Sequence, residues 1–479
     1  MRRIAKPYDK DDSYLMNYAI EKRPPHDIID GIYHEGGQEM SYELSLKRLP
    51  NFLRYVNKVY GLSQTIDSMQ SEGDADVSPQ TIFMSVFLCL LLRMGSLLQL
   101  SKDVEAGRIR KFLPQVDKET FCANTLGNGL ERVDTDIIQQ ELTVVPRKLR
   151  RNKAYGTAKD PGTIGGFKIV STDGTEHFRS ESIQCPECME VHVKTKEGIK
   201  THYVHRMVIM YVVGRTRSSA VQVILGAEPA LPKDVTEDEE PGHEGEVTAA
   251  RRLIENMIAL YGSHFFDVLT TDAYYTTMPF VLFVDSLDKY LVSRVKREDT
   301  TLYQEIDILS GMVEPIYVDD REERVECWIY EVPELQASLD WDVPTRGFKI
   351  TEKEYKIESG EKVYIKEGTF LCMTTLPVEM ADADTVRQIV HAKWGIENNA
   401  IKDLKDNWYM THNFHHHPNA TYALLLIMFM VYNLFYAYVF RHMKSYRLYH
   451  PTMKRIVEDF QSSFFHWKWR MSWVHFDGT

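Results

Sequence analysis

The sequence predicts an α/β protein, in which a mixed sheet is flanked by helices, an all-helical region comes first and a β-rich insertion interrupts the sheet. Two observations lead to this prediction. The pattern changes from helical periodicity to apolar strands after the Gly- and Pro-rich stretch "YGTAKDPGTIGG" (155–166). Beyond it, three strands follow in sequence, and helices and strands then alternate, which is typical of a sheet with both parallel and antiparallel neighbours.

The N-terminal part divides into a polar arm (1–40), rich in turn residues, and a helical region (41–154). Within the helical region, "LGNG" (126–129) contains two glycines and is expected to form a turn between two short helices. This pair fits a DNA-binding helix–turn–helix, and its spacing fits an ordinary helical hairpin equally well.

The α/β domain is expected over 160–298 and 366–479, with the insertion at 299–365. The insertion has short, charged, β-leaning pieces such as "VECWIYEVPE" and "RGFKITEKEYKIE". The expected strands and helices of the domain are strands at 167–178, 202–214 and 219–229, a helix from about Gly245, a strand at 265–275, a helix at 277–288 and a strand at 290–296.

The net charge of −12 argues weakly against a nucleic-acid partner, because seven carboxylates lie in one short segment, "DVTEDEEPGHEGE" (234–246). Basic groups cluster elsewhere, as in "RKLRRNK" (147–153). Six cysteines and a polar N-terminus without a signal sequence indicate a reducing, cytoplasmic setting.

One apolar segment, "PNATYALLLIMFMVYNLFYAYVF" (418–440), has 23 residues without a charge and is long enough to cross a bilayer. It contains Asn433 and four tyrosines, and no second segment matches it. We therefore expect a buried core helix and no membrane partner.

Three carboxylates stand at positions where packing alone would not put them. Asp173 comes late in an apolar strand, and Asp272 ends another, where either could simply form a turn or cap a helix. Glu397 falls in the middle of a helical stripe, with Lys393 one turn earlier on the same face. The apolar members of that stripe are Val386, Val390, Ile401, Leu404 and Trp408.

Asp173 and Asp272 end strands of one sheet and can therefore lie side by side, and a helix packed across the sheet can add Glu397. Three converging carboxylates repel one another unless cations neutralise them. Hard oxygen ligands suit Mg²⁺ or Mn²⁺, and a pair of such ions is what two-metal phosphoryl transfer requires. The alternative for Glu397 is a plain i,i+4 ion pair with Lys393.

These residues carry a resemblance to a known family. "DGTEHF", "LTTDAYYTTMPF" and "AKWGIENN" resemble the three acidic motifs of DDE transposases of bacterial insertion sequences, in the branch with an RNase H-like fold and a β-rich insertion before the catalytic Glu. The resemblance covers about residues 100–440. In the third motif Lys393 replaces the family's Arg, and Val390 and Leu404 stand where a Tyr and a Lys are expected.

The resemblance implies an RNase H-like catalytic domain, a preceding DNA-binding region, and Asp173, Asp272 and Glu397 as catalytic ligands of two Mg²⁺ or Mn²⁺ ions. The implied reaction is cleavage at transposon ends followed by attack of the freed 3′-OH on target DNA. Double-stranded DNA is then the partner, a homodimer pairs the ends, and the protein acts on the bacterial nucleoid in the cytoplasm. A structure-selective nuclease and a DNA-binding regulator are the alternatives. The sequence has no Gly-rich phosphate-binding loop, so we expect no nucleotide cofactor.

DNA contacts are expected from Lys393 and from Lys402 and Lys405, which flank the position of the family's Lys. Lys296 ends a strand near the expected site, where it contacts phosphates or is simply solvated. Trp328 in the insertion stacks on an unpaired base or packs as an ordinary strand residue.

A second constellation, "CPECMEVHVKTKEGIKTHYVH" (185–205), has the C-x₂-C spacing of a zinc knuckle (183–205). We predict a structural Zn²⁺ held by Cys185, Cys188 and His205, completed by His202 or His243. Residues three apart on a strand face opposite sides, which counts against His202 together with His205. His243, in the acidic loop, is the other candidate, because sequences of the family that this chain resembles look to have a cysteine near that loop. The alternative is a turn with two reduced thiols.

Overall fold

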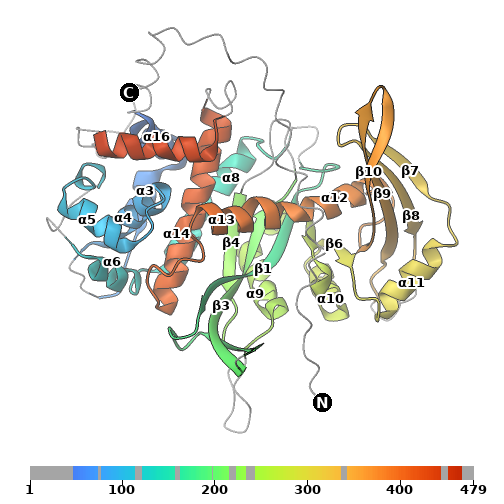
Figure 1. Ribbon diagram of the computed structural model, residues 1–479, viewed down its shortest axis with the longest axis horizontal. Helices are drawn as coiled ribbons and strands as arrows, with labels where there is room; N and C mark the ends of the chain where they lie inside the picture. Colours follow the sequence, from blue (N-terminus) through green and yellow to red (C-terminus); the bar gives the residue numbers. More distant parts are fainter. Residues whose placement is uncertain are drawn as a thin grey trace.

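The computed structural model describes residues 47–73, 77–113, 121–156, 162–196, 198–214, 223–233, 243–335, 342–443 and 451–466. The expected polar arm (1–40) and most of the acidic segment lie outside these residues. Figure 1 shows a helical part, a central sheet and an outlying β-rich part side by side, with one long helical segment running across the last two. That segment carries Glu397.

The helical part is built around α14 (Pro418–Ala437), which α4, α6, α7 and α8 contact. Most of α4 is buried, and Ser78 caps its N-terminus by accepting from the Thr81 N–H at 3.3 Å. Besides α14, the helices of this part are α2 (Arg48–Tyr60), α3 (Leu62–Ser68), α4 (Pro79–Leu91), α5 (Leu97–Glu105), α6 (Ala123–Leu130), α7 (Thr135–Leu142), α8 (Val144–Arg151) and α16 (Met453–His466).

The turn expected at "LGNG" (126–129) is instead helical and belongs to α6. Close packing explains the glycines, because a Cβ on Gly127 would lie 2.4 Å from His415 Nδ1 and one on Gly129 would lie 2.2 Å from Ile82 Cδ1. The chain turns four residues later, where Asp134 caps α7. Glycine here marks a close approach between elements and not a turn.

The apolar helix α14 is a core element, as expected. It is the one helix among the described residues that is long and apolar enough to cross a membrane, and 94% of its most apolar window is buried inside the protein. Asn433 explains its polar interruption, because its side chain accepts from the Ile224 N–H at 2.8 Å and donates to the Ile224 carbonyl at 2.7 Å. The Asn433 side chain of α14 thereby hydrogen-bonds the backbone of strand β4 at its outer edge.

The central sheet has the mixed topology that the sequence predicts. In space the order is β4-β3-β1-β5-β6, in which β3 is antiparallel to β4 and to β1, whereas β1, β5 and β6 run parallel. Helices flank the sheet, since α9 (Glu246–Tyr261) packs on β3 and β4, and α10 (Met278–Ser286) packs on β6. The strands are β1 (Ile169–Ser180), β2 (Met189–Thr195), β3 (Gly198–Val212), β4 (Val223–Pro229), β5 (Val268–Thr271) and β6 (Tyr290–Val295).

The insertion continues the central sheet rather than forming a sheet of its own. The last residues of β10, Leu371–Thr374, pair with β6, and the whole of β10 pairs with β9. A helix, α11, which the sequence pattern did not predict, covers β8 and β9. The elements are α11 (Thr301–Ser310), β7 (Ile316–Asp320), β8 (Val325–Val332), β9 (Arg346–Glu358) and β10 (Glu361–Thr374).

The segment with the third acidic motif is not a uniform α-helix. It consists of α12 (Ala383–Gly395), a π-helical stretch η6 (Ile396–Ile401) and α13 (Lys402–Asn407). The apolar stripe is buried as expected. In the π turn, however, Ile396 and Ala400 are the buried residues, and Glu397 lies at the edge with 47% of its side chain exposed. Lys393, in α12 just before this turn, is a buried charge with 3% of its side chain exposed. The expectation that Glu397 sits in the middle of the buried stripe is therefore wrong.

Candidate active site

Asp173 and Asp272 come from neighbouring parallel strands. Ser171 of β1 pairs with Thr270 of β5, and continuing this register brings Asp173 level with Asp272. Asp272 follows the last residue of β5, and its Oδ1 accepts from the Tyr274 N–H at 2.8 Å. Strand order thus puts two carboxylates at the same end of the sheet.

Lys393 joins these acids to the helical segment. Its ammonium lies 3.4 Å from Asp173 Oδ2 and forms an ion pair with Glu397. Burial lowers the pKa of Lys393, but the charges of Asp173, Glu397 and Asp272 outweigh this and raise it overall. The structure therefore brings the three predicted acids together around one buried cation. It also forms the ion pair with Glu397 that the sequence interpretation had set aside in favour of a DNA contact.

Asp173 is a largely buried carboxyl with a raised pKa. Burial raises its pKa to about 7, the charge of Lys393 opposes this, and the charges of Glu397, Asp272 and Glu246 add to it. Burial is the main cause of this rise, and the three neighbouring carboxylates add to it. The site thus gathers several carboxylates beside the buried ammonium of Lys393.

Glu246 is a fourth carboxylate, which sequence reasoning missed. Its Oε1 accepts from the Gly174 N–H at 3.1 Å and from the Tyr275 hydroxyl at 2.6 Å. Burial and then the charge of Asp272 raise its pKa. Gly174 leaves room for it, since a Cβ there would lie 2.2 Å from Glu246 Cδ. In the sequence Glu246 ends a run of seven carboxylates, and nothing distinguishes it from the other six.

Comparison with known proteins bears on this site. Residues 219–434 match the family model described as the transposase DDE domain. This part of the chain is therefore similar to a transposase DDE domain. The matched residues include Asp272 and Glu397, while Asp173 lies on β1, before the match begins.

Two further comparisons concern the whole chain. A cryo-EM structure of the piggyBac transposase synaptic complex with hairpin DNA aligns at 10% identity and a TM-score of 0.33, over 88% of this chain and 85% of that chain. No curated protein matches the chain.

The residues predicted to contact DNA lie in different surroundings. Lys402 and Lys296 are exposed. Lys405 is partly buried, which lowers its pKa, and the charges of Glu176 and Asp173 oppose this shift. Trp328 is half-buried on β8, with Tyr317 at 5.5 Å between ring centroids and the Lys353 ammonium at 5.4 Å from its ring.

Three of the predicted zinc ligands lie together, and a different histidine takes the place of the predicted fourth ligand. Cys185, Cys188 and His205 lie together, and the fourth side chain is His416, from the loop before α14. All four donor atoms lie within 4.8 Å of one another. The prediction of His202 or His243 as the fourth member does not agree with this placement.

The two replaced candidates lie near the cluster without joining it. His202 is three residues from His205 on β3, a spacing that puts their side chains on opposite faces of the strand. His243 lies beside the knuckle, where its side chain hydrogen-bonds the Cys188 backbone. The sequence did contain His416, within "HNFHHHP" (412–418), but no spacing rule connects it with a cysteine 228 residues earlier.

Proposed function

We propose that this protein is a DNA transposase that cleaves phosphodiester bonds at transposon ends and joins the freed 3′-OH to target DNA. The observation that supports this best is the gathering of Asp173, Asp272 and Glu397 around Lys393 in a chain of which a part is similar to a transposase DDE domain. One acid comes from β1, one from the end of β5 and one from the π turn.

The chemistry of these donors fits two Mg²⁺ or Mn²⁺ ions. Carboxylate oxygens are the ligands such cations prefer, and Asp173, Asp272 and Glu397 would hold them. Burial, and then the charges of Glu397, Asp272 and Glu246, disfavour the ionised form of Asp173 and raise its pKa, and bound cations would favour the ionised form. When bound, the ions would supply Lewis acidity to the attacking and leaving oxygens, so no covalent protein–DNA link is required.

The protein groups around the acids fix their positions. The Tyr274 N–H orients Asp272, and the Tyr275 hydroxyl and the Gly174 N–H orient Glu246 beside them. In our proposal Glu246 adds negative charge to the same cluster. Pre-set carboxylates reduce the reorganisation needed when substrate and cations arrive.

Lys393 has two successive roles in this proposal. Without cations its ammonium neutralises Asp173 and Glu397. Cations at those carboxylates would take over this role and free the ammonium for a phosphate oxygen of DNA, as the sequence interpretation expects. Lys402, Lys405, Lys296 and Trp328 are proposed as further DNA contacts, and the helical region (41–154) as the part that binds transposon ends.

The wider setting is proposed on the same basis. Double-stranded DNA is the partner, and a homodimer would hold two transposon ends together. The protein would act on the nucleoid in the cytoplasm of a bacterium.

The test uses the DNA that flanks the gene. Short inverted repeats bracketed by a small direct duplication are expected there, and a fragment with both repeats serves as substrate. Glu397→Gln should abolish Mg²⁺-dependent cleavage while leaving binding to the repeats unchanged. Glu255→Gln, at an exposed position on α9, is the matched control. Mg²⁺-dependent cleavage by the Glu397 variant would contradict the assignment.

A second arm of this experiment separates transposase from nuclease. With a target plasmid present, strand transfer gives products in which the fragment ends are joined to the plasmid. Cleavage without joined products would point to a structure-selective nuclease, and binding without cleavage to a DNA-binding regulator.

A further inference from the structure

We propose that Cys185, Cys188, His205 and His416 form a tetrahedral site for a structural Zn²⁺, which fastens the β2–β3 hairpin to the loop before α14. The inference is independent of the proposed catalysis. Two ligands lie in the loop between β1 and β2, one lies on β3, and one comes from a segment more than 200 residues away in the sequence.

The distances between the donor atoms are those that zinc requires. Cys185 Sγ and Cys188 Sγ are 3.7 Å apart, and His205 Nε2 lies 3.2 and 3.3 Å from them. His416 Nε2 lies 3.4 Å from Cys188 Sγ. Tetrahedral Zn²⁺, with bonds of about 2.3 Å to sulfur and about 2.0 Å to nitrogen, separates sulfurs by about 3.8 Å and sulfur from nitrogen by about 3.5 Å. One ion at the centre would reach all four donors.

The donors are also of the right kind. Thiolate and imidazole are the usual ligands of structural zinc. Both cysteines are free thiols, and the Cys185 N–H donates to Cys188 Sγ at 3.3 Å, which fixes the position of that sulfur.

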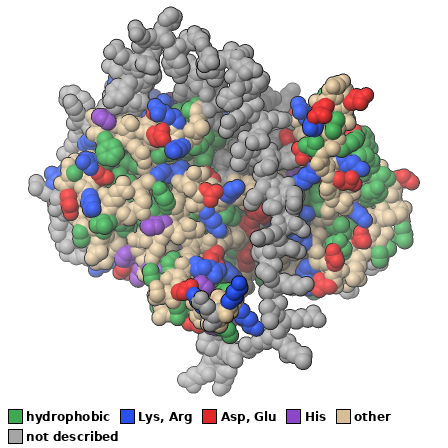
Figure 2. All heavy atoms as spheres, viewed as in Figure 1, with side chains coloured by type: hydrophobic (Ala, Val, Ile, Leu, Met, Phe, Trp, Pro, Cys, Tyr) green, Lys and Arg blue, Asp and Glu red, His purple; other side chains and the backbone are tan. Residues whose placement is uncertain are grey.

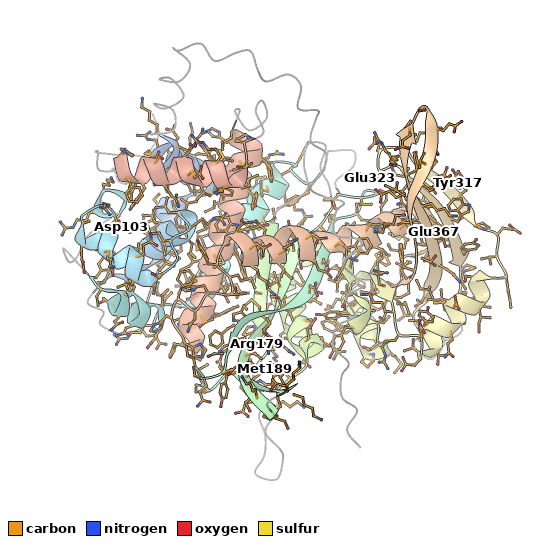
Figure 3. The ribbon with its side chains drawn as sticks, in the orientation of Figure 1. Asp103, Arg179, Met189, Tyr317, Glu323 and Glu367 are labelled. Carbon is orange, nitrogen blue, oxygen red and sulfur yellow. The ribbon has the colours of Figure 1, made fainter. Side chains whose placement is uncertain are left out.

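Strand pairing places the loop with the two cysteines beside His205. Val204 of β3 pairs with Arg179 of β1 on one side and with Met189 of β2 on the other. Figure 3 labels Arg179 and Met189, which lie close together where the hairpin leaves the sheet. The β1–β2 loop with both cysteines therefore begins and ends beside His205, the next residue of β3.

His416 connects this corner of the sheet to the helical part. Its ring packs on Phe178 at 4.3 Å between centroids. The preceding residue, His415, contacts Glu131 at 2.7 Å, and Asn419 donates to the Val133 carbonyl at 2.9 Å. The loop is thus already held by the helical part, and zinc would attach the hairpin to the same loop.

A closed set of four protein ligands leaves no position for substrate, so the role is structural. Closing a loop between His205 and His416 constrains the unfolded chain, and zinc would add its binding free energy to folding. Figure 2 shows basic side chains over the hairpin, and Lys194, Lys196, Lys200 and Arg206 lie on its strands and turn. Zinc would hold this basic hairpin in a fixed position on the sheet.

Metal analysis of the full-length protein, purified without chelators, tests the site. We expect about one Zn²⁺ per chain in the wild type and in His202→Ala, and loss of more than half of it from His416→Ala and Cys188→Ala. With Co²⁺ in place of zinc, the wild type should give the intense visible bands of a tetrahedral thiolate site, which His416→Ala shifts and His202→Ala preserves. Less than half an equivalent in folded wild-type protein would overturn the site. Equal zinc content and equal spectra of the His416 and His202 variants would overturn the fourth ligand.

If Cys188→Ala does not fold, a chain that keeps all four proposed ligands still tests the site. In a Cys122→Ser background, which removes the exposed thiol, a mercurial reagent should release one zinc per two thiols modified. Trypsin should then cut the hairpin after Lys194, Lys196 or Lys200 at least five-fold faster than in the zinc-loaded protein. Release of no zinc, or an unchanged cleavage rate, contradicts the fastening role.

Discussion

The ammonium of Lys393 and the carboxylate of Asp173 lie 3.4 Å apart, one on the helical segment that crosses the sheet and one on β1. Both side chains are largely buried, and Glu397 shares the same ammonium. This contact joins α12 to β1 at the candidate active site. Its consequences can be measured separately from catalysis.

Changing Lys393 to Met should lower the free energy of unfolding of the metal-free protein by about 2–4 kcal/mol at pH 8, because it leaves Asp173 without its counter-ion. Mg²⁺ should then stabilise the variant more than it stabilises the wild type, since added cations replace the missing charge. Urea unfolding with EDTA or with Mg²⁺ measures both effects. Lys402→Met, an exposed position on the same segment, is the control. Equal responses of the two variants would contradict the role of Lys393.

Asp173 predicts a pH dependence with a definite sign. Its pKa is raised from 3.8 to about 7, mainly by burial, so between these values the folded state holds a proton that the unfolded state has lost. The metal-free protein therefore loses stability as pH rises from about 4 to about 7. Asp173→Asn removes this loss, so its free energy of unfolding should exceed that of the wild type by on the order of 1–3 kcal/mol at pH 8.

The advantage of the Asn variant should shrink as the pH falls toward 4, which a series of urea titrations in EDTA would measure. Asp285→Asn, at an exposed position on α10, is the charge-matched control. An Asn variant that is less stable than the wild type at pH 8 would show that the ionised carboxylate is favoured in the fold.

Asn433 tests the place of the apolar helix. Asn433→Leu should destabilise the protein by about 2–4 kcal/mol, because it leaves the N–H and the carbonyl of Ile224 buried without partners. Met430→Leu, a buried change on the same helix that conserves volume, should cost less than about 1.5 kcal/mol. A helix that faced lipid would tolerate Asn433→Leu or gain from it, so a neutral result contradicts the core position.

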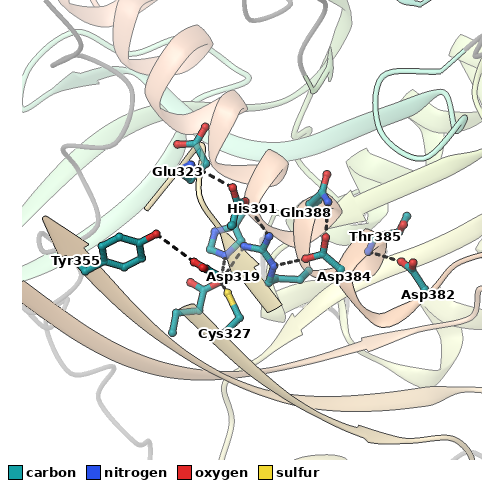
Figure 4. A network of polar contacts seen from close by, with 12 residues as sticks. Asp319, Glu323, Cys327, Tyr355, Asp382, Asp384, Thr385, Gln388 and His391 are labelled. Carbon is teal, nitrogen blue, oxygen red and sulfur yellow. Dashed lines mark hydrogen bonds and ion pairs between the residues drawn. The ribbon is translucent and has the colours of Figure 1, made fainter. Parts of the chain in front are cut away.

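Arg387 tests the attachment of α12 to the insertion. Its side chain is 5% exposed and pairs with Asp384 at 2.7 Å, Asp320 at 3.1 Å and Glu352 at 3.3 Å. Figure 4 shows this network, with Asp384 and His391 on the helix facing the strands of the insertion. Removing one partner of buried ion pairs is costly, so Arg387→Met should destabilise by about 3–5 kcal/mol.

The matched control for this change is Arg321→Met. Arg321 is 86% exposed and pairs with Asp319 on the same insertion, so its loss should cost less than about 1 kcal/mol. Chemical denaturation of both variants measures the difference. Similar small losses for the two would mean that the network does not hold α12 in place.

The sheet and its carboxylates were accessible to sequence reasoning because they depend on short-range patterns. Apolar runs marked β1, β3, β4, β5 and β6 to within a few residues, and Asp173 and Asp272 stood out because they end such runs. Cys185 and Cys188 stood out through their spacing alone. In each case a local rule, the alternation of a strand or a ligand spacing, carries the information.

Other features depended on contacts between distant segments. The glycines of α6 looked like a turn, because a sequence does not reveal that His415 and Ile82 pack against them. The period of an ideal helix put Glu397 in the buried stripe, whereas in the π turn Ile396 is buried and Glu397 lies at the edge.

The sequence by itself therefore determined the mixed sheet and the core helix, and it singled out three acids and two thiols as candidates. Only the tertiary structure decided that Glu246 joins the acids and that His416 completes the cysteine–histidine cluster. The physical reason is that side chains far apart in the chain meet only where packing brings their elements together. A carboxylate or an imidazole has the same local pattern whether or not it reaches such a meeting point.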